Sequence, residues 1–112
     1  MTKNEVLYTV VEIINEHKSA DCPEATENSD LANDLGMGSL DLFESAVYIE
    51  RRLNFEFDYK ESKKVIYNIK TVKDLVRLIC KKLNIPFIDV KKTLPKNNIV
   101  MSVVNNNEQN KR

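Results

Sequence analysis

The sequence contains no tryptophan, one histidine, two glycines and three prolines. So few glycines and prolines favour helices over a fold that is rich in tight turns. No apolar run approaches the roughly 20 residues that cross a bilayer, so we expect no membrane-spanning segment. The first residues carry spaced rather than continuous apolar side chains, and we identify no secretory signal.

The two cysteines, Cys22 and Cys80, form no CxxC pair, and His17 is the only histidine. A zinc site or a Cys–His catalytic pair would have to be assembled from scattered residues, so we expect neither a metal site nor an enzyme. Free thiols are typical of a reducing compartment, and we therefore expect a cytoplasmic protein. Cys80 falls on the inner side of a helical pattern, where we expect a small core residue.

Charges of the two signs balance, with 17 acidic and 17 basic side chains. This balance argues against binding through a general basic surface, so we expect no nucleic-acid partner. The acidic and basic residues are unevenly distributed along the chain, however. Residues 1–58 hold 13 acidic and 4 basic side chains, a net charge of −9, and residues 59–112 hold 4 and 13, a net charge of +9. The sequence therefore predicts two electrostatically distinct surfaces.

Two long segments have the spacing of apolar residues that is typical of amphipathic helices. The first opens with a capping box of Thr2 and Glu5 and ends near His17. The second begins at Ser39, which we predict to be its N-cap, and ends at Asn54. The predicted inward residues are Val6, Leu7, Val10, Ile13 and Ile14 in the first helix, and Leu40, Phe43, Ala46, Val47, Ile49 and Leu53 in the second.

Two further helices are predicted after a short extended link. Residues 59–68 favour a short helix, and a clearer helix begins after Thr71, where Asp74 completes a variant of the capping box. This last helix ends by Asn84, because Pro86 disfavours helical geometry in the residue before it. The predicted inward residues are Val65 and Ile66 in the short helix, and Val72, Leu75, Val76, Ile79 and Leu83 in the last.

A long polar connection, residues 18–38, joins the first two helices, and Leu31 and Leu35 are its predicted anchors to the core. Three longer helices and one short helix predict an all-α fold, a small four-helix bundle, over residues 1–84.

The remaining residues, 85–112, show no helical periodicity and are rich in lysine and asparagine. We predict a mostly disordered tail there. Within the tail, the apolar run at 99–104 is β-prone and is a candidate docking segment.

Residues 34–41 have the sequence Asp-Leu-Gly-Met-Gly-Ser-Leu-Asp. This stretch resembles the attachment motif of acyl carrier proteins, which is Asp-Leu-Gly, two further residues, then Ser-Leu-Asp. The helix order and the Thr71-Val72 pair that opens the last helix extend the resemblance over about residues 3–84. The resemblance implies the four-helix fold of that family and a carrier that performs no chemistry itself. It also implies that Ser39 bears a 4′-phosphopantetheine arm, which holds acyl groups as thioesters.

The resemblance further implies the partners. These are a phosphopantetheinyl transferase and the enzymes that load and use acyl groups, in fatty-acid or related lipid or secondary-metabolite biosynthesis. Carriers of this family meet their enzymes through the start of the second helix, and we expect a monomer. The residues predicted to recognise partners are Leu40, Asp41, Glu44, Glu50 and Arg51.

The chain departs from the family pattern at several positions. Gly38 stands where the family usually has an aspartate, and Ser45 replaces an aliphatic residue. Arg51 and Arg52 stand where acyl carriers are usually acidic. These departures leave open an aminoacyl, peptidyl or D-alanyl carrier of the same fold. They also leave open an unmodified helical adaptor in which Ser39 is only a helix cap.

A set of apolar residues near the motif has two interpretations. The set could line an interior groove for an acyl chain, or it could be ordinary core, which is the more common meaning of helical apolar spacing. Its members are Leu42, Phe43, Val47, Ile66, Tyr67 and Ile69.

Overall fold

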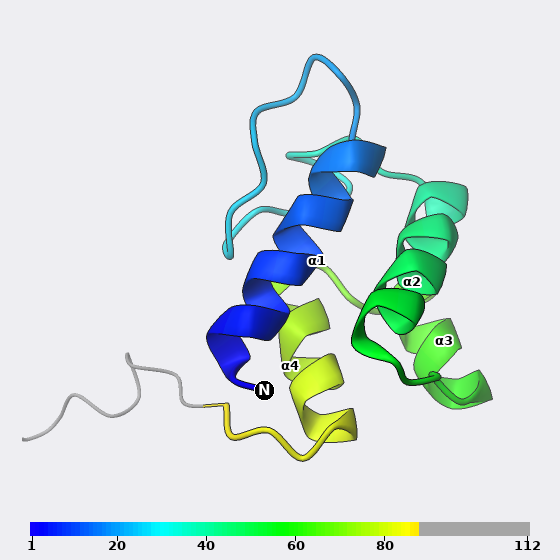
Figure 1. The fold of residues 1–112 in the computed structure, drawn as a ribbon. Helices are drawn as coiled ribbons and strands as arrows, with labels where there is room; N and C mark the ends of the chain where they lie inside the picture. Colours follow the sequence, from blue (N-terminus) through cyan, green and yellow to red (C-terminus); the bar gives the residue numbers. More distant parts are fainter. Residues whose placement is uncertain (88–112) are drawn as a thin grey trace, which may run out of the picture.

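Four helices make up most of residues 1–87, the part of the chain that the computed structural model describes. They are α1 (Lys3–His17), α2 (Ser39–Leu53), α3 (Tyr59–Tyr67) and α4 (Val72–Lys82), drawn in Figure 1. The predicted all-α fold of three longer helices and one short helix is confirmed. Residues 88–112 of the predicted disordered tail, with the predicted docking segment at 99–104, lie outside the described residues.

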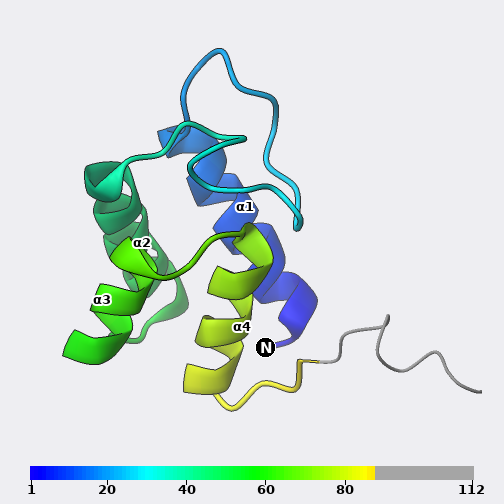
Figure 2. The ribbon, with the colours of Figure 1, turned by 180° about the vertical axis from the view of Figure 1, so that it is seen from behind.

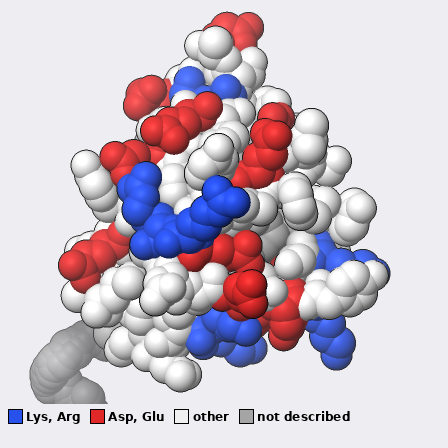
Figure 3. Space-filling view, turned by 45° about the vertical axis from the view of Figure 1, so that its right-hand side comes forward, with Lys and Arg blue, Asp and Glu red and all other residues white. Residues whose placement is uncertain are grey.

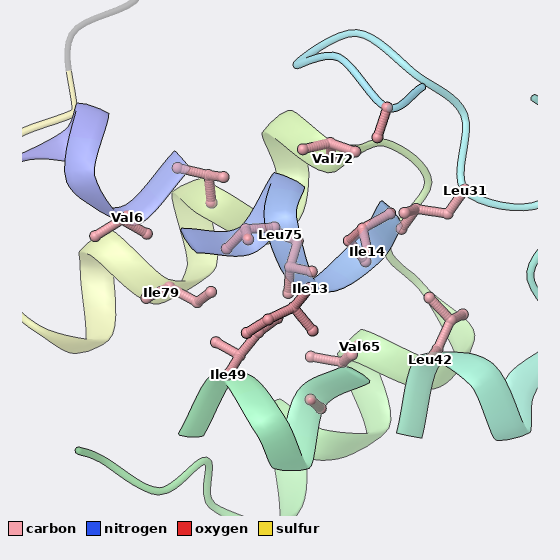
Figure 4. Close-up of a cluster of buried hydrophobic side chains, with 14 of the residues drawn as sticks. Val6, Ile13, Ile14, Leu31, Leu42, Ile49, Val65, Val72, Leu75 and Ile79 are labelled. Atoms are coloured by element: carbon pink, nitrogen blue, oxygen red, sulfur yellow. The ribbon is translucent and has the colours of Figure 1, made fainter. Parts of the chain in front are cut away.

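The helices surround one apolar core. α1 packs against α2 and against α4, while α3 packs against α2. Figure 2 shows the bundle from behind, with the loop between α1 and α2 folded over its upper end. Figure 4 shows that all four helices and this loop contribute side chains to the core. The most deeply buried large side chains are Val6, Val10, Ile13, Ile14, Leu31, Leu35, Ile49, Val65, Val72, Leu75, Val76 and Ile79.

Local capping signals fix where the helices begin. At α1 the backbone N–H of Thr2 donates to the Glu5 carboxylate at 2.7 Å, and the Glu5 N–H donates to the Thr2 hydroxyl at 3.2 Å. Thr71 and Asp74 make the same reciprocal pair at α4. Both predicted capping boxes are confirmed, because each depends only on residues three apart in the chain.

The inward face of α2 differs from its prediction. Leu40 and Phe43 were expected in the core, but they are 67% and 52% exposed. Leu42 and Ser45 are buried in their place, together with Ala46, Ile49 and Leu53. The buried face of α2 includes the polar Ser45. For this reason the spacing of apolar residues alone predicts the wrong inward face.

The end of α4 extends the packed part of the chain beyond Asn84. Asn84 adopts the left-handed conformation, and the backbone N–H of Ile85 donates to the Cys80 carbonyl at 2.8 Å. Ile85 and Phe87 then pack against the core cluster. The buried Cys80 is a small core residue as predicted, and its burial raises the pKa of its thiol.

Four predicted inward residues are only half-buried, namely Leu7, Val47, Ile66 and Leu83. Of these, Leu7 and Leu83 pack against the buried core cluster.

Backbone hydrogen bonds hold the long loop in place. The Leu31 N–H donates to the Lys70 carbonyl at 2.8 Å, and the Met37 N–H donates to the Leu31 carbonyl at 3.0 Å. The predicted anchors Leu31 and Leu35 are both buried. The loop is therefore a fixed part of the fold that delivers the chain to the first residue of α2.

Candidate functional site

Ser39 is the first residue of α2 and lies on the surface. The structure corrects its predicted role as N-cap, because the cap position is held by Gly38, whose carbonyl accepts from the Leu42 N–H at 3.0 Å. The Asp41 carboxylate supplies the capping interaction and accepts from the Gly38 N–H at 3.0 Å. The Ser39 hydroxyl makes no hydrogen bond to any described residue, so it is available for chemistry.

Gly36 and Met37 fix the position of the loop before Ser39. Gly36 takes a left-handed conformation with φ of 64°, and a Cβ added to it would lie 3.0 Å from the Ser19 Cβ. A side chain there would strain the left-handed backbone and crowd the Ser19 side chain. The next residue, Met37, is buried between the two glycines and anchors the segment to the core.

Ser39 lines an open groove of about 370 Å³ between the loop, α2 and the segment that leaves α3. Four residues of the predicted groove set line it, namely Leu42, Ile66, Tyr67 and Ile69. The other two, Phe43 and Val47, do not line it. Figure 4 shows Leu42 on α2 near Val65 of α3 and Leu31 of the loop.

Lys70 lines the same groove and was not among the predicted site residues. Its ammonium lies 4.0 Å from the Asp30 carboxylate and is largely exposed. The hydrogen bond from the Asn33 backbone, with another from Ala32, lowers the pKa of Asp30, so this carboxylate stays charged beside Lys70. Lys70 is 31 positions from Ser39 in the chain, and only the fold brings the two to one groove.

Two of the predicted recognition residues are free on the surface beside Ser39. Leu40 is 67% exposed, and Glu44 is exposed without a hydrogen bond to the described residues. Phe43 is exposed as well, so the start of α2 presents apolar side chains and one carboxylate.

The other predicted recognition residues have structural roles or lie farther along α2. Asp41 caps the helix, as described above, and the Glu50 carboxylate accepts from the Phe57 N–H at 2.7 Å. Arg51 is exposed and lies over the Tyr48 ring, 6.0 Å from its centroid. The neighbouring Arg52 instead forms an ion pair of 2.7 Å with Glu12. Arg51 thus remains a cation without a carboxylate partner among residues 1–87.

No group of His, Cys, Asp and Glu side chains among residues 1–87 could hold a metal ion. No helix in this part of the chain is long and apolar enough to cross a membrane.

Comparison with known proteins gives a consistent group of relatives, although no protein-family model matches the chain. The sequence is 35% identical over 79 residues to the acyl carrier protein of Coprothermobacter proteolyticus, covering 70% of this chain and 92% of that protein. It is 35% identical over 85 residues to the acyl carrier protein of Petrotoga mobilis, covering 76% and 95% of the two chains. It is 33% identical over 79 residues to the acyl carrier protein of Prochlorococcus marinus, covering 70% and 94%.

Proposed function

The chain belongs to the acyl carrier protein family, and from this premise we propose that Ser39 is the attachment point of a 4′-phosphopantetheine arm. Acyl carrier proteins are carriers rather than enzymes, and the role of this chain is that of a carrier. The single observation that supports Ser39 most strongly is its exposed, unbonded hydroxyl at the first position of α2.

The surroundings of Ser39 fit such an arm. A phosphodiester there would meet the free backbone N–H groups and the positive dipole end of α2. The Lys70 ammonium also lies on the groove wall, where the Asp30 carboxylate 4.0 Å away offsets part of its charge. When bound, the arm supplies a terminal thiol that holds the cargo as a thioester.

The groove gives the cargo a place to lie. The apolar Leu42, Ile66 and Ile69 line the same groove as Ser39, and a fatty acyl chain is apolar along its length. The groove is open rather than enclosed, so a partner enzyme could withdraw the chain without unfolding the bundle. We therefore propose acyl cargo of fatty-acid or related lipid or secondary-metabolite biosynthesis, handled by a monomer in the cytoplasm.

The free surface at the start of α2 is where we place the partners, a phosphopantetheinyl transferase and the acyl-loading and acyl-using enzymes. Leu40 and Phe43 offer apolar contact area, and Glu44 offers a negative charge to a basic partner surface. Asp41 and Glu50 contribute negative potential, although their carboxylates are already engaged within the fold.

One observation keeps an aminoacyl, peptidyl or D-alanyl carrier as the second candidate. Gly38 leaves the position before Ser39 without a carboxylate, and Arg51 adds a free cation farther along α2. A less acidic surface suits a different set of enzymes. An unmodified adaptor is the remaining alternative, and it predicts no arm at all.

Intact mass spectrometry after co-expression with a broad-specificity phosphopantetheinyl transferase tests the attachment. The wild-type chain should gain the mass of one arm, and Ser39→Ala should not. Ser45→Ala is the matched control on the same helix, because Ser45 is buried and should leave the gain intact. A normal gain in Ser39→Ala would refute the assignment.

A further inference from the structure

The outer surface of α3 and α4 is strongly basic. Between residues 59 and 87 the chain carries eight lysine and arginine side chains against two carboxylates. On α3, Lys60, Lys63, Lys64 and Tyr67 follow the i, i+3, i+4, i+7 spacing of a single face, and all four are exposed. Apart from Tyr67, which also lines the groove of Ser39, this surface lies outside the arm-bearing region and has no role in the proposed function.

A groove between the two helices joins their basic residues into one surface. An open cavity of about 280 Å³ lies between them. Its lining residues are Lys64 from α3, Ile69 from the connection, and Asp74, Arg77, Leu78 and Lys81 from α4. Figure 2 shows α3 and α4 side by side on the face seen from behind.

Several of these cations lack a partner in the described part of the chain. Asp74 pairs with Arg77 at 3.2 Å, and Glu61 pairs with Lys82 at 3.0 Å, so both carboxylates of the segment are engaged. The ammonium groups of Lys60, Lys64 and Lys81 have no such ion pair with residues 1–87. Their charge is therefore available to an external anion.

We propose that this basic face, the exposed surface of α3 and α4 around Lys60, Lys64 and Lys81, binds the anionic surface of a phospholipid bilayer. Clusters of four to eight basic residues on amphipathic helices are attracted to anionic lipid, at about 1 kcal/mol for each residue near the surface. Tyr59 and Tyr67, which are 76% and 71% exposed, add amphipathic rings of the kind that sit at the headgroup level. The contact is peripheral and inserts no helix.

The composition of the face favours a bilayer over a protein partner. All its cations except Arg77 are lysines, and protein interfaces are depleted in lysine and enriched in arginine. Lysine is a flexible, strongly hydrated point charge, which suits a mobile array of headgroups better than a fixed carboxylate.

The acidic half of the molecule does not cancel this attraction. Figure 3 looks toward α2 and shows red side chains prevailing over the upper part of the face, with blue side chains gathered near its middle and lower edge. Charges farther apart than about 8 Å are largely screened at physiological ionic strength, so each surface acts separately. Repulsion of the acidic half would turn the basic face toward the bilayer. Tyr67 and Lys70 border the groove of Ser39, so the arm would emerge at the edge of the bound surface.

Co-sedimentation of the full chain with vesicles tests this inference. Equimolar phosphatidylglycerol and phosphatidylcholine should bind the protein, while phosphatidylcholine alone should not, and high salt should release it. Neutralising three lysines in the variant Lys60→Gln/Lys64→Gln/Lys81→Gln should weaken partitioning by roughly a hundredfold, at about fivefold for each residue. Circular dichroism checks that the variant remains folded.

The matched control removes the same charge elsewhere, in Lys91→Gln/Lys92→Gln/Lys96→Gln. This control should retain most of the binding. Equal loss in the two variants, no loss in the first, or equal binding to neutral vesicles would overturn the proposal. Ser39→Ala should bind vesicles like the wild type, so failure of the arm assignment and failure of lipid binding can be told apart.

Discussion

The Asp41 carboxylate accepts a hydrogen bond from the Gly38 backbone N–H across the first turn of α2. The two residues flank Ser39, so the cap is completed around the serine and not by it. This arrangement leaves the Ser39 hydroxyl without a structural task. Removing that hydroxyl should consequently cost little stability, whereas removing the Asp41 carboxylate should cost more.

The first prediction follows from that cap. Asp41→Ala should lower the free energy of unfolding by about 0.5–2 kcal/mol, because the first turn of α2 loses its capping acceptor. Urea denaturation measures the change. Glu44→Ala is the control, since Glu44 is exposed and makes no described hydrogen bond, and its stability should match the wild type. Equal losses in both variants would show that the cap contributes nothing.

The second prediction concerns Ser45, which is buried with a hydroxyl oxygen that has no hydrogen-bond partner in the described residues. An unpaired buried polar group costs about 1–3 kcal/mol. Ser45→Ala should therefore raise the melting temperature or leave it unchanged. A clear drop would mean that the hydroxyl is satisfied in solution.

These two residues show how much of α2 could be predicted. Its approximate length and its end at Asn54 follow from local sequence. The face that α2 turns toward the core does not follow from local sequence. The spacing of apolar residues predicts an inward Phe43, but Phe43 is exposed and Ser45 is buried, because packing against α1 and α3 decides which face is buried. The cap moved from Ser39 to Gly38 for a similar reason. A serine is a good cap in isolation, but the carboxylate at Asp41 performs the task from inside the helix.

The motif could be predicted from the sequence, whereas the groove could not. Residues 34–41 are contiguous, so the sequence alone is enough to reveal the family resemblance and to predict Ser39 as the attachment residue. The groove needs Ile69 and Lys70 from the α3–α4 connection, and only the packed bundle brings them to Ser39. The basic charge of the second half is visible in the sequence, but its union into one face depends on α3 and α4 lying together.

The third prediction concerns the end of the packed domain. A chain that stops after Phe87 should melt like the full chain, whereas one that stops after Asn84 should be less stable by roughly 1–3 kcal/mol. Ile85 and Phe87 pack on the core. The centroid of the Phe87 ring lies 4.7 Å from the Lys3 Nζ and 4.9 Å from the Arg77 Cζ. Thermal unfolding compares the two truncations. Identical melting temperatures would show that the contacts of residues 85–87 carry no stability.

The fourth prediction concerns acid stability. The Asn33 backbone hydrogen bond lowers the pKa of Asp30 below its ordinary value of 3.8. A lowered folded-state pKa gives stability that is present above the unfolded pKa and is lost as pH falls through the folded pKa. Asp30→Asn should thus be less stable than the wild type near neutral pH, and the difference should shrink below about pH 3.8.

Chemical denaturation over an acidic pH series measures that difference. Glu24→Gln is the control, because Glu24 is exposed and accepts no described hydrogen bond. A gap between wild type and Asp30→Asn that stays constant with pH would contradict the pKa shift.

The fifth prediction concerns recognition. Glu44→Lys should slow phosphopantetheine transfer, because it reverses the free charge beside Ser39. Glu16→Lys, an equal charge change on the exposed side of α1, should have a smaller effect. Arg51→Glu should leave the rate unchanged or raise it with a typical acyl-carrier enzyme. Rim charges act mainly on association rate, and both effects should shrink at high salt.

Transfer kinetics at low and high ionic strength provide the measurement. If Arg51→Glu proves more damaging than Glu44→Lys, the arginine is a partner contact. The enzymes that serve this carrier would then present acidic surfaces.

The most direct test of the central claim is fragmentation mass spectrometry of the chain purified from its own host. We expect one phosphopantetheine group, located on Ser39, and its thioester mass identifies the cargo. A fully unmodified chain would support the adaptor alternative, and a group located on any other residue would contradict the assignment of Ser39.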